Sequence, residues 1–215
     1  MLQAVFQRTT NAMIQQTGIV PNIHALRVET IAGVKQLWCY EQNGVVKVVT
    51  ADLGPASLQL ADMNCTLDGD TAIDREVTAG DKPYRLTLVS TGSLHAIVFL
   101  EDIDQVDLDR EGPALEHCDV FPDRVNAHFV QVLSPNHLRM RIWERGSGAT
   151  RGCGTGACAA VAAGLVGGRS GASCLVDQPG GRQYVDISDT TCLTGETLHV
   201  CGGEWRPETR VGESS

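Results

Sequence analysis

The sequence predicts an α+β fold in which two similar halves of short strands wrap around a central helix, with the first half incomplete. Three observations predict this fold. A run of small apolar residues at 157–166 is typical of a helix that is buried on all sides. Short strand-like segments separated by turn residues occupy most of the chain. A helix, a glycine-marked turn and strands follow one another twice, which indicates two related α/β units.

The first unit begins with a predicted helix at 4–17, where apolar residues fall at roughly helical spacing and Gly18 would end the helix. Strands are expected at 24–31, 35–41 and 45–51. The last two are separated by Gln42-Asn43-Gly44, and Asn-Gly is a strong signal for a hairpin. We place the end of this unit near residue 54. The expected domains are therefore a truncated N-terminal half (1–54) and a C-terminal half (55–215).

The second unit is expected to contain a glycine-rich turn at 152–156, followed by the apolar helix. An acidic segment at 102–116 is expected to be a solvated loop or short helix, with the charges of 101–111 at the surface. The predicted strands of this unit are 84–90, 95–100, 127–133, 137–143, 173–176, 182–187 and 196–201.

Composition excludes several classes of function. The 17 basic and 26 acidic residues give a net charge of −9, so we expect no nucleic-acid partner. The longest apolar run, about ten residues, is too short to span a bilayer. No basic segment followed by an apolar core begins the sequence, and we expect no membrane partner and a cytoplasmic location. The eight cysteines have no metal-ligand spacing, so reduced buried thiols and no metal are expected.

The strongest chemical signal is Gly152-Cys153-Gly154-Thr155-Gly156, directly before the apolar helix. Its glycines let a ligand approach the backbone, and a helix N-terminus favours an anion such as a carboxylate. The same field is expected to lower the pKa of the Cys153 thiol from about 8.5 to roughly 7–8, which would suit a general base. The alternative interpretation is a tight turn into a buried helix, with Cys153 packed in the core as we expect for Cys158.

The run from Trp143 to Ala160 resembles the second catalytic-cysteine motif of the diaminopimelate epimerase family. The resemblance implies a cofactor-independent isomerase that converts LL- to meso-diaminopimelate, an amino-acid substrate of lysine and peptidoglycan-precursor synthesis. It also implies two similar α/β halves with the active site between them. The flanking segments that share the family's order are Thr91-Gly92-Ser93-Leu94-His95, Asp123-Arg124-Val125-Asn126, Glu144-Arg145, Pro179-Gly180-Gly181 and Leu193-Thr194-Gly195.

This resemblance implies a mechanism with two acid–base groups. One cysteine, as thiolate, removes the α-proton, and a second, as thiol, protonates the opposite face. By position, Cys153 would be the acid or base of the second half. The N–H groups of Gly154 and Thr155 would bind the substrate α-carboxylate. Glu144 would tune the protonation of the thiol and contact the substrate ammonium group.

Three further residues receive roles from the resemblance. Arg145 and Asn126 would hold the distal end of the substrate. His95 would be the imidazole near the opposite thiol, where it would poise a proton near neutral pH. Each has a structural alternative. His95 could be a hydrogen-bonded residue at a strand end, Asn126 could cap a turn, and Glu144 and Arg145 could be a solvated pair.

The chain departs from the family pattern at several positions. Leu2 and Gln3 occupy the region where the first catalytic cysteine is expected, and Ser93 replaces a substrate-binding Asn. Ala149 and Glu196 replace an expected Glu and Pro. We therefore expect a homodimer, or a separate segment or chain that supplies the missing N-terminal part. The alternatives left open are a chain that is inactive alone, a non-catalytic carboxylate-binding subunit, and a racemase of another amino acid.

Overall fold

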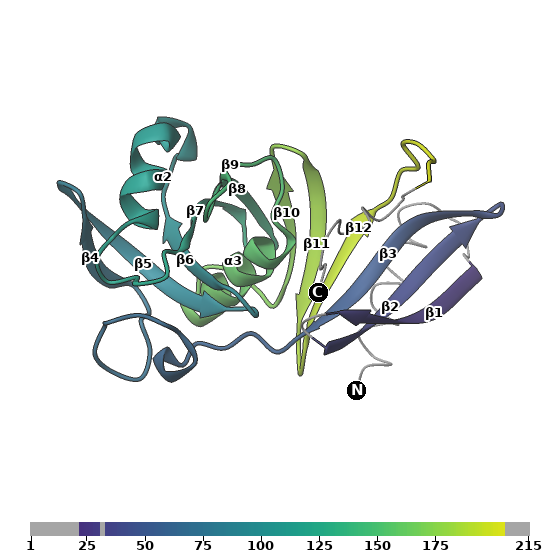
Figure 1. The fold of residues 1–215 in the computed structure, drawn as a ribbon, viewed down its shortest axis with the longest axis horizontal. Coiled ribbons are helices and arrows are strands. Elements are labelled where there is room, and N and C mark those ends of the chain that lie inside the picture. Colours follow the sequence, from purple (N-terminus) through teal and green to yellow (C-terminus); the bar gives the residue numbers. More distant parts are fainter. Residues whose placement is uncertain (1–21, 31–32, 205–215) are drawn as a thin grey trace, which may run out of the picture.

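The computed structural model describes residues 22–30 and 33–204 (Figure 1). Within them, twelve strands form one mixed sheet in the order β1-β2-β3-β12-β11-β10-β8-β7-β6-β5-β4, with β9 attached to β8. The strands are β1 (Asn22–Thr30), β2 (Gly33–Gln42), β3 (Val45–Gly54), β4 (Arg75–Ala79), β5 (Lys82–Ser90), β6 (Leu94–Phe99), β7 (Asn126–Ser134), β8 (His137–Glu144), β9 (Gly148–Ala149), β10 (Ser173–Gln178), β11 (Gly181–Ile187) and β12 (Thr191–Glu196). The helices are η1 (Leu60–Asp62), η2 (Ile103–Gln105), α2 (Leu108–Glu116) and α3 (Gly154–Val166).

Helix α3 lies inside the part of the sheet that curves around it, while β1, β2 and β3 extend away from the helix (Figure 1). It contacts β5 to β8 and β10 to β12, and every residue from Gly156 to Gly164 is buried. Alanine has a small side chain and glycine has none, so strands can approach this helix from several sides. The predicted α+β class and the predicted buried helix are both confirmed. The helix begins three residues earlier than expected, at Gly154, and Cys153 is its N-cap.

Two strand pairs in the sheet are parallel. β6 pairs with β7 and β8 pairs with β10, while the other pairs are antiparallel. The chain passes through α2 between β6 and β7, and through α3 between β8 and β10. Parallel neighbouring strands need such a crossover connection. The two helices therefore lie in the connections that join the two parallel strand pairs.

The N-terminal strands confirm the predicted hairpin. β2 and β3 are antiparallel, and Asn43 and Gly44 between them have φ angles of 53° and 78°. Positive φ at both central residues is what a type I′ turn requires, and Asn-Gly adopts it readily. β3 continues the sheet by pairing with β12, near the opposite end of the sequence. The helix expected at 4–17 lies outside the described residues.

The expected strand at 196–201 is wrong. The last strand of the chain is instead β12, at Thr191–Glu196, and 197–204 contain no strand. The apolar residues Leu198 and Val200 suggested an alternating pattern, yet their side chains are 85% and 84% exposed. Ser188 donates its N–H to the carbonyl of Thr190, and this tight turn brings β12 beside β11 five residues earlier than expected.

The acidic segment forms η2 and α2, so the expected short helix is confirmed, and the acidic side chains of 101–109 are exposed as expected. Glu111 in α2 departs from the expectation, because it is only 5% exposed. Glu111 accepts hydrogen bonds from Lys82 Nζ at 2.6 Å and Tyr84 Oη at 3.0 Å. A buried carboxylate needs such partners, and β5 supplies both of them. None of the helices in the described ranges is long and apolar enough to cross a membrane.

Candidate active site

Cys153 lies where the connection from β9 enters α3, with an extended backbone at φ −138° and ψ 106°. The side chain of Gln178, at the end of β10, bonds to this backbone. Its Oε1 accepts from the Cys153 N–H at 2.7 Å, and its Nε2 donates to the Cys153 carbonyl at 3.3 Å. A Cβ at Gly154 would lie 2.7 Å from Leu193 Cδ2, so β12 packs directly against the start of the helix. The helix N-terminus is thus fixed from two neighbouring strands.

The thiol of Cys153 faces the first turn of α3. The Thr155 hydroxyl lies 3.6 Å from Sγ, and the Gly156 N–H also donates to the sulfur. Both donors favour the thiolate. Burial disfavours the thiolate more strongly, and the charge of Glu144 adds to it, so the pKa of Cys153 is raised above its ordinary value. The lowered pKa expected from the sequence is wrong, because the residue is only 6% exposed.

Glu144 ends β8 beside the Cys153 loop. Its Oε1 accepts a hydrogen bond from the Thr150 hydroxyl at 2.5 Å. The carboxylate also interacts with the Cys153 thiol. The structure therefore brings together the predicted carboxylate and the predicted thiol, with Thr155 beside them.

Two histidines from adjacent strands lie next to this thiol. His95 on β6 and His128 on β7 are fully buried, and His95 Nδ1 lies 2.9 Å from His128 Nε2. His95 Nε2 lies 2.9 Å from the Ser93 hydroxyl. Burial is the main cause that lowers the pKa of His95 to about 4, with the positive charge of Arg145 adding to it. His95 is therefore neutral at pH 7, and the expected titration near neutral pH is wrong.

Two more of the predicted residues, Asn126 and Arg145, lie close to His95. Asn126 pairs with His95 in the β6–β7 register. Its amide donates to the Leu94 carbonyl at 2.9 Å and accepts from the Arg145 N–H at 3.0 Å. Arg145 Nη1 donates to the Asp123 carbonyl at 3.0 Å. Asn126 thus links β6 to the turn after β8, and the role of Asn126 and Arg145 toward a substrate stays a prediction.

Sequence reasoning missed two residues of this site. His128 lies in an unbroken run of buried residues at the start of β7, with Ala127 and Phe129 on either side of it, and such a run indicates a strand buried on both faces. A histidine at such a position signals a polar partner, which here is His95. Gln178 gave no local signal, because it reaches Cys153 only through the pairing of β10 with β8.

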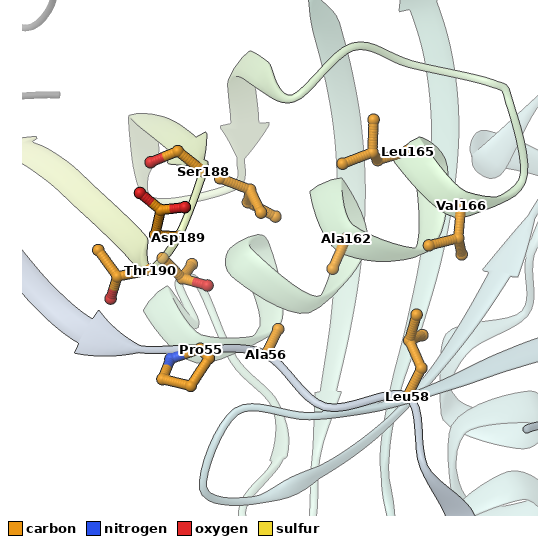
Figure 2. Close-up of a pocket in the computed structure, with 11 residues that line it drawn as sticks. Pro55, Ala56, Leu58, Ala162, Leu165, Val166, Ser188, Asp189 and Thr190 are labelled. Atoms are coloured by element: carbon orange, nitrogen blue, oxygen red, sulfur yellow. The ribbon is translucent and has the colours of Figure 1, made fainter. Parts of the chain in front are cut away.

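A separate cavity lies at the other end of α3 (Figure 2). It has a volume of about 130 Å³ and is mainly apolar. Its walls are the connection at Pro55–Leu58, the last turn of α3 at Leu165 and Val166, and the turn at Ser188–Thr190. A helix of 13 residues is about 20 Å long, so this cavity is distant from Cys153. The polar groups that converge on one place, Cys153, Glu144 and His95, lie instead at the N-terminal end of α3.

Comparison with known proteins places this geometry in a family. The family described as diaminopimelate epimerase matches residues 87–200, just over half of the chain. A diaminopimelate epimerase of Synechococcus elongatus is 42% identical over 160 residues, which are 73% of this chain and 57% of the relative. One of Methanothermobacter thermautotrophicus is 41% identical over 162 residues, 75% of this chain and 57% of the relative. The chain thus spans little more than half the length of these curated relatives.

Solved structures share the fold. A hydroxyproline epimerase from Agrobacterium vitis superposes with a TM-score of 0.62 at 18% identity, covering 87% of this chain and 61% of that one. A probable proline racemase from Agrobacterium radiobacter gives a TM-score of 0.62 at 16% identity, covering 93% and 67%. At these identities the likeness concerns the fold alone.

Proposed function

Because this chain belongs to the diaminopimelate epimerase family, we propose that it carries the cysteine-bearing half of a cofactor-independent amino-acid epimerase. The proposed reaction interconverts LL- and meso-diaminopimelate by proton transfer at one α-carbon. The observation that carries this proposal is the position of Cys153: its thiol lies at the N-terminus of α3, with Glu144 and the Gly156 N–H beside it.

Cys153 is the proposed proton-transfer group on one face of the substrate. Its pKa is raised, so the thiol form predominates at neutral pH and can donate a proton. In the reverse sense, the thiolate removes the α-proton. Hydrogen bonds from Thr155 and from the Gly156 N–H stabilise that thiolate. Both directions are required of a reversible epimerase.

The start of α3 is the proposed carboxylate site. The first N–H groups of an α-helix have no intrahelical acceptor, so those of Gly154 and Thr155 can bind the α-carboxylate. They would stabilise the negative charge that spreads onto the carboxylate as the α-proton leaves. Glu144 would contact the substrate ammonium group, and Arg145 and Asn126 would face the distal end.

The opposite face of the substrate needs a second acid–base group. An α-carbon held between two such groups lies about 3–3.5 Å from each, which separates the groups by roughly 6–7 Å. His95 and His128 place ligand atoms within 4.8 Å of the Cys153 sulfur, so they lie on its side of the substrate. We propose that a second copy of this chain or a separate chain supplies this second acid–base group. It would lie beside residues 1–54, the proposed N-terminal half. A cytoplasmic location is part of the same proposal.

The test is incubation with LL-diaminopimelate in heavy water, following both deuterium uptake at the α-carbon and optical inversion. Exchange that disappears in Cys153→Ala and persists in Cys201→Ala supports the proposal, because Cys201 is an exposed thiol that controls for general cysteine loss. Saturable binding without exchange would instead identify a carboxylate-binding subunit. Exchange of another amino acid but not of diaminopimelate would identify a racemase with a different substrate.

A further inference from the structure

Three metal-ligating side chains converge beside the first turn of α3. One ligand atom each from His95, His128 and Cys153 lies within 4.8 Å of the other two, and all three residues are buried. They come from β6, β7 and the N-cap of α3. A Cβ at Gly156 would lie 2.6 Å from His128 Nε2 and 3.1 Å from Cys153 Sγ, so both atoms face the same bare Cα. The cluster is held by rigid elements on every side.

The hydrogen bonds within the cluster leave one nitrogen unused. His128 Nδ1 is buried without a hydrogen-bond partner. If His128 Nε2–H donates to His95 Nδ1, and His95 Nε2–H donates to Ser93, then the unused nitrogen is a bare lone pair. The opposite tautomers would bury an unpaired N–H, which is costlier. In this arrangement the proton of His128 is on Nε2, the nitrogen that faces Cys153 Sγ across Gly156. A cation bound at Nε2 therefore requires the proton to move to Nδ1, which has no other partner to lose.

We propose that His95, His128 and Cys153 form a binding site for a thiophilic divalent cation, Zn²⁺ being the best match. Two imidazole nitrogens and one thiolate are ligands that Zn²⁺ prefers, and three protein ligands leave the fourth tetrahedral position to water or another small ligand. Zinc bonds of about 2.0–2.3 Å require the ligand atoms to be about 3.3–3.7 Å apart. The ligand atoms lie within 4.8 Å of one another, so no separation exceeds this spacing by more than about 1.5 Å, and rotation of the Cys153 side chain about its Cα–Cβ bond supplies the difference.

Charge also favours the cation. Binding releases the thiol proton to solvent and leaves a thiolate. That thiolate and the neighbouring carboxylate of Glu144 together balance the two positive charges of the ion. Arg145 opposes binding, because its positive charge acts on His95. A monovalent hard cation gains nothing from sulfur and nitrogen ligands, so the site discriminates by ligand chemistry.

A metal ion bound there would prevent Cys153 from taking part in proton transfer. The sulfur lone pair that accepts the α-proton would be bonded to the metal, so Zn²⁺ would inhibit proton transfer. This consequence rests on the proposed function, whereas the binding of metal does not. Inhibition is expected to be reversed by a chelator, since no covalent bond to carbon forms.

The test is a Zn²⁺ titration by calorimetry, together with Co²⁺ absorption, on the reduced full chain in a Cys201→Ser background. This background removes the exposed thiol. One Zn²⁺ per chain is expected, with a sulfur-to-cobalt charge-transfer band. His128→Gln is expected to weaken binding at least about tenfold, since even partners outside the ligand shell are worth that much. Cys153→Ser should abolish the band, and its nearly unchanged volume guards against misfolding. His137→Gln is the matched control, because His137 pairs with Asp177 outside the cluster.

Unchanged affinity in both His128→Gln and Cys153→Ser would overturn the proposal, as would the absence of any stoichiometric binding. These readouts do not depend on catalysis. A chain that binds Zn²⁺ at the cluster but exchanges no α-proton would refute the proposed function and leave the metal site standing. A chain that exchanges protons and ignores Zn²⁺ would do the reverse.

Discussion

The side chain of Gln178 satisfies both backbone polar groups of Cys153, accepting from its N–H and donating to its carbonyl. Gln178 Nε2 also donates to Gln183 Oε1 at 2.8 Å, which ties this contact to β11. The residue that places the thiol thus belongs to a strand 25 positions later in the sequence. Gln178 is a positioning residue in the proposed reaction, because it acts on the substrate only through Cys153.

Replacing Gln178 with leucine is expected to lower kcat about tenfold, with a smaller change in KM. The Cys153 N–H loses its acceptor, which costs about 1–3 kcal/mol of stability. The thiol then loses its fixed position, and small misplacements slow proton transfer strongly. The measurement is α-proton exchange combined with urea unfolding.

Gln178→Glu distinguishes an effect on the position of the Cys153 thiol from a general loss of stability. Glutamate keeps an acceptor for the Cys153 N–H and adds a negative charge near the thiol. That charge should raise the pKa of Cys153 further and move the pH–rate profile to higher pH. A profile identical to that of the unaltered chain would contradict the assignment.

The buried histidine pair predicts a loss of stability in acid. The pKa of His95 is about 4 in the folded chain and about 6.5 when unfolded, so its contribution is present above pH 6.5 and lost as the pH falls toward 4. A shift of this size corresponds to about 3 kcal/mol. Burial also lowers the pKa of His128, which adds in the same direction.

Urea unfolding at several pH values between 7.5 and 4 measures this effect. His95→Gln is less stable at pH 7.5, because the bonds to His128 and Ser93 are lost. Its stability should nevertheless fall less steeply with acid than that of the unaltered chain. Parallel curves for the two proteins would show that His95 does not titrate as described.

Gly156→Ala is expected to destabilise the chain by about 1–3 kcal/mol through overpacking. In an open helix the same change would stabilise by about 1 kcal/mol. Here the new Cβ would lie 2.6 Å from His128 Nε2, and a buried ring between two strands has little room to move. Thermal unfolding is the measurement, with Gly195→Ala as control, since nothing lies within 4 Å of a Cβ there. A higher Tm for Gly156→Ala would refute the close packing.

Glu116→Ala is expected to lower stability by about 2–4 kcal/mol. Glu116 is buried at the end of α2 and accepts hydrogen bonds from Trp143 Nε1 at 2.7 Å and from the Gly146 N–H at 2.9 Å. The substitution leaves both donors without this acceptor. Glu101→Ala, at an exposed position, should change stability by no more than about 0.5 kcal/mol. Equal effects of the two substitutions in urea unfolding would contradict this account.

Local features explain what the sequence could predict. The Asn43-Gly44 hairpin and the Ala-rich helix depend on neighbouring residues, and the structure confirms both. The resemblance around Cys153 likewise indicated the family. The strand predicted at 196–201 is wrong because the pairing of β12 with β3 ends at Glu196, and Leu198 beyond it is exposed. That end of the pairing depends on β3, which is distant in sequence.

The electrostatics of the site could not be predicted locally. A helix N-terminus does favour a thiolate, but burial by surrounding strands outweighs it and raises the pKa of Cys153. Glu111 and His95 show the same limit. Each is buried by elements distant in sequence, and only their contacts with Tyr84 and His128 reveal how that burial is tolerated.

The pairing of β3 with β12 has a consequence during synthesis of the protein. Thr50 and Thr194 share a hydrogen bond of 2.8 Å across 144 positions of sequence. During synthesis, the edge of β3 that pairs with β12 therefore stays uncovered until residues 191–196 have been made. A nascent chain released before residue 191 would carry an open strand edge, which is a template for association with other chains.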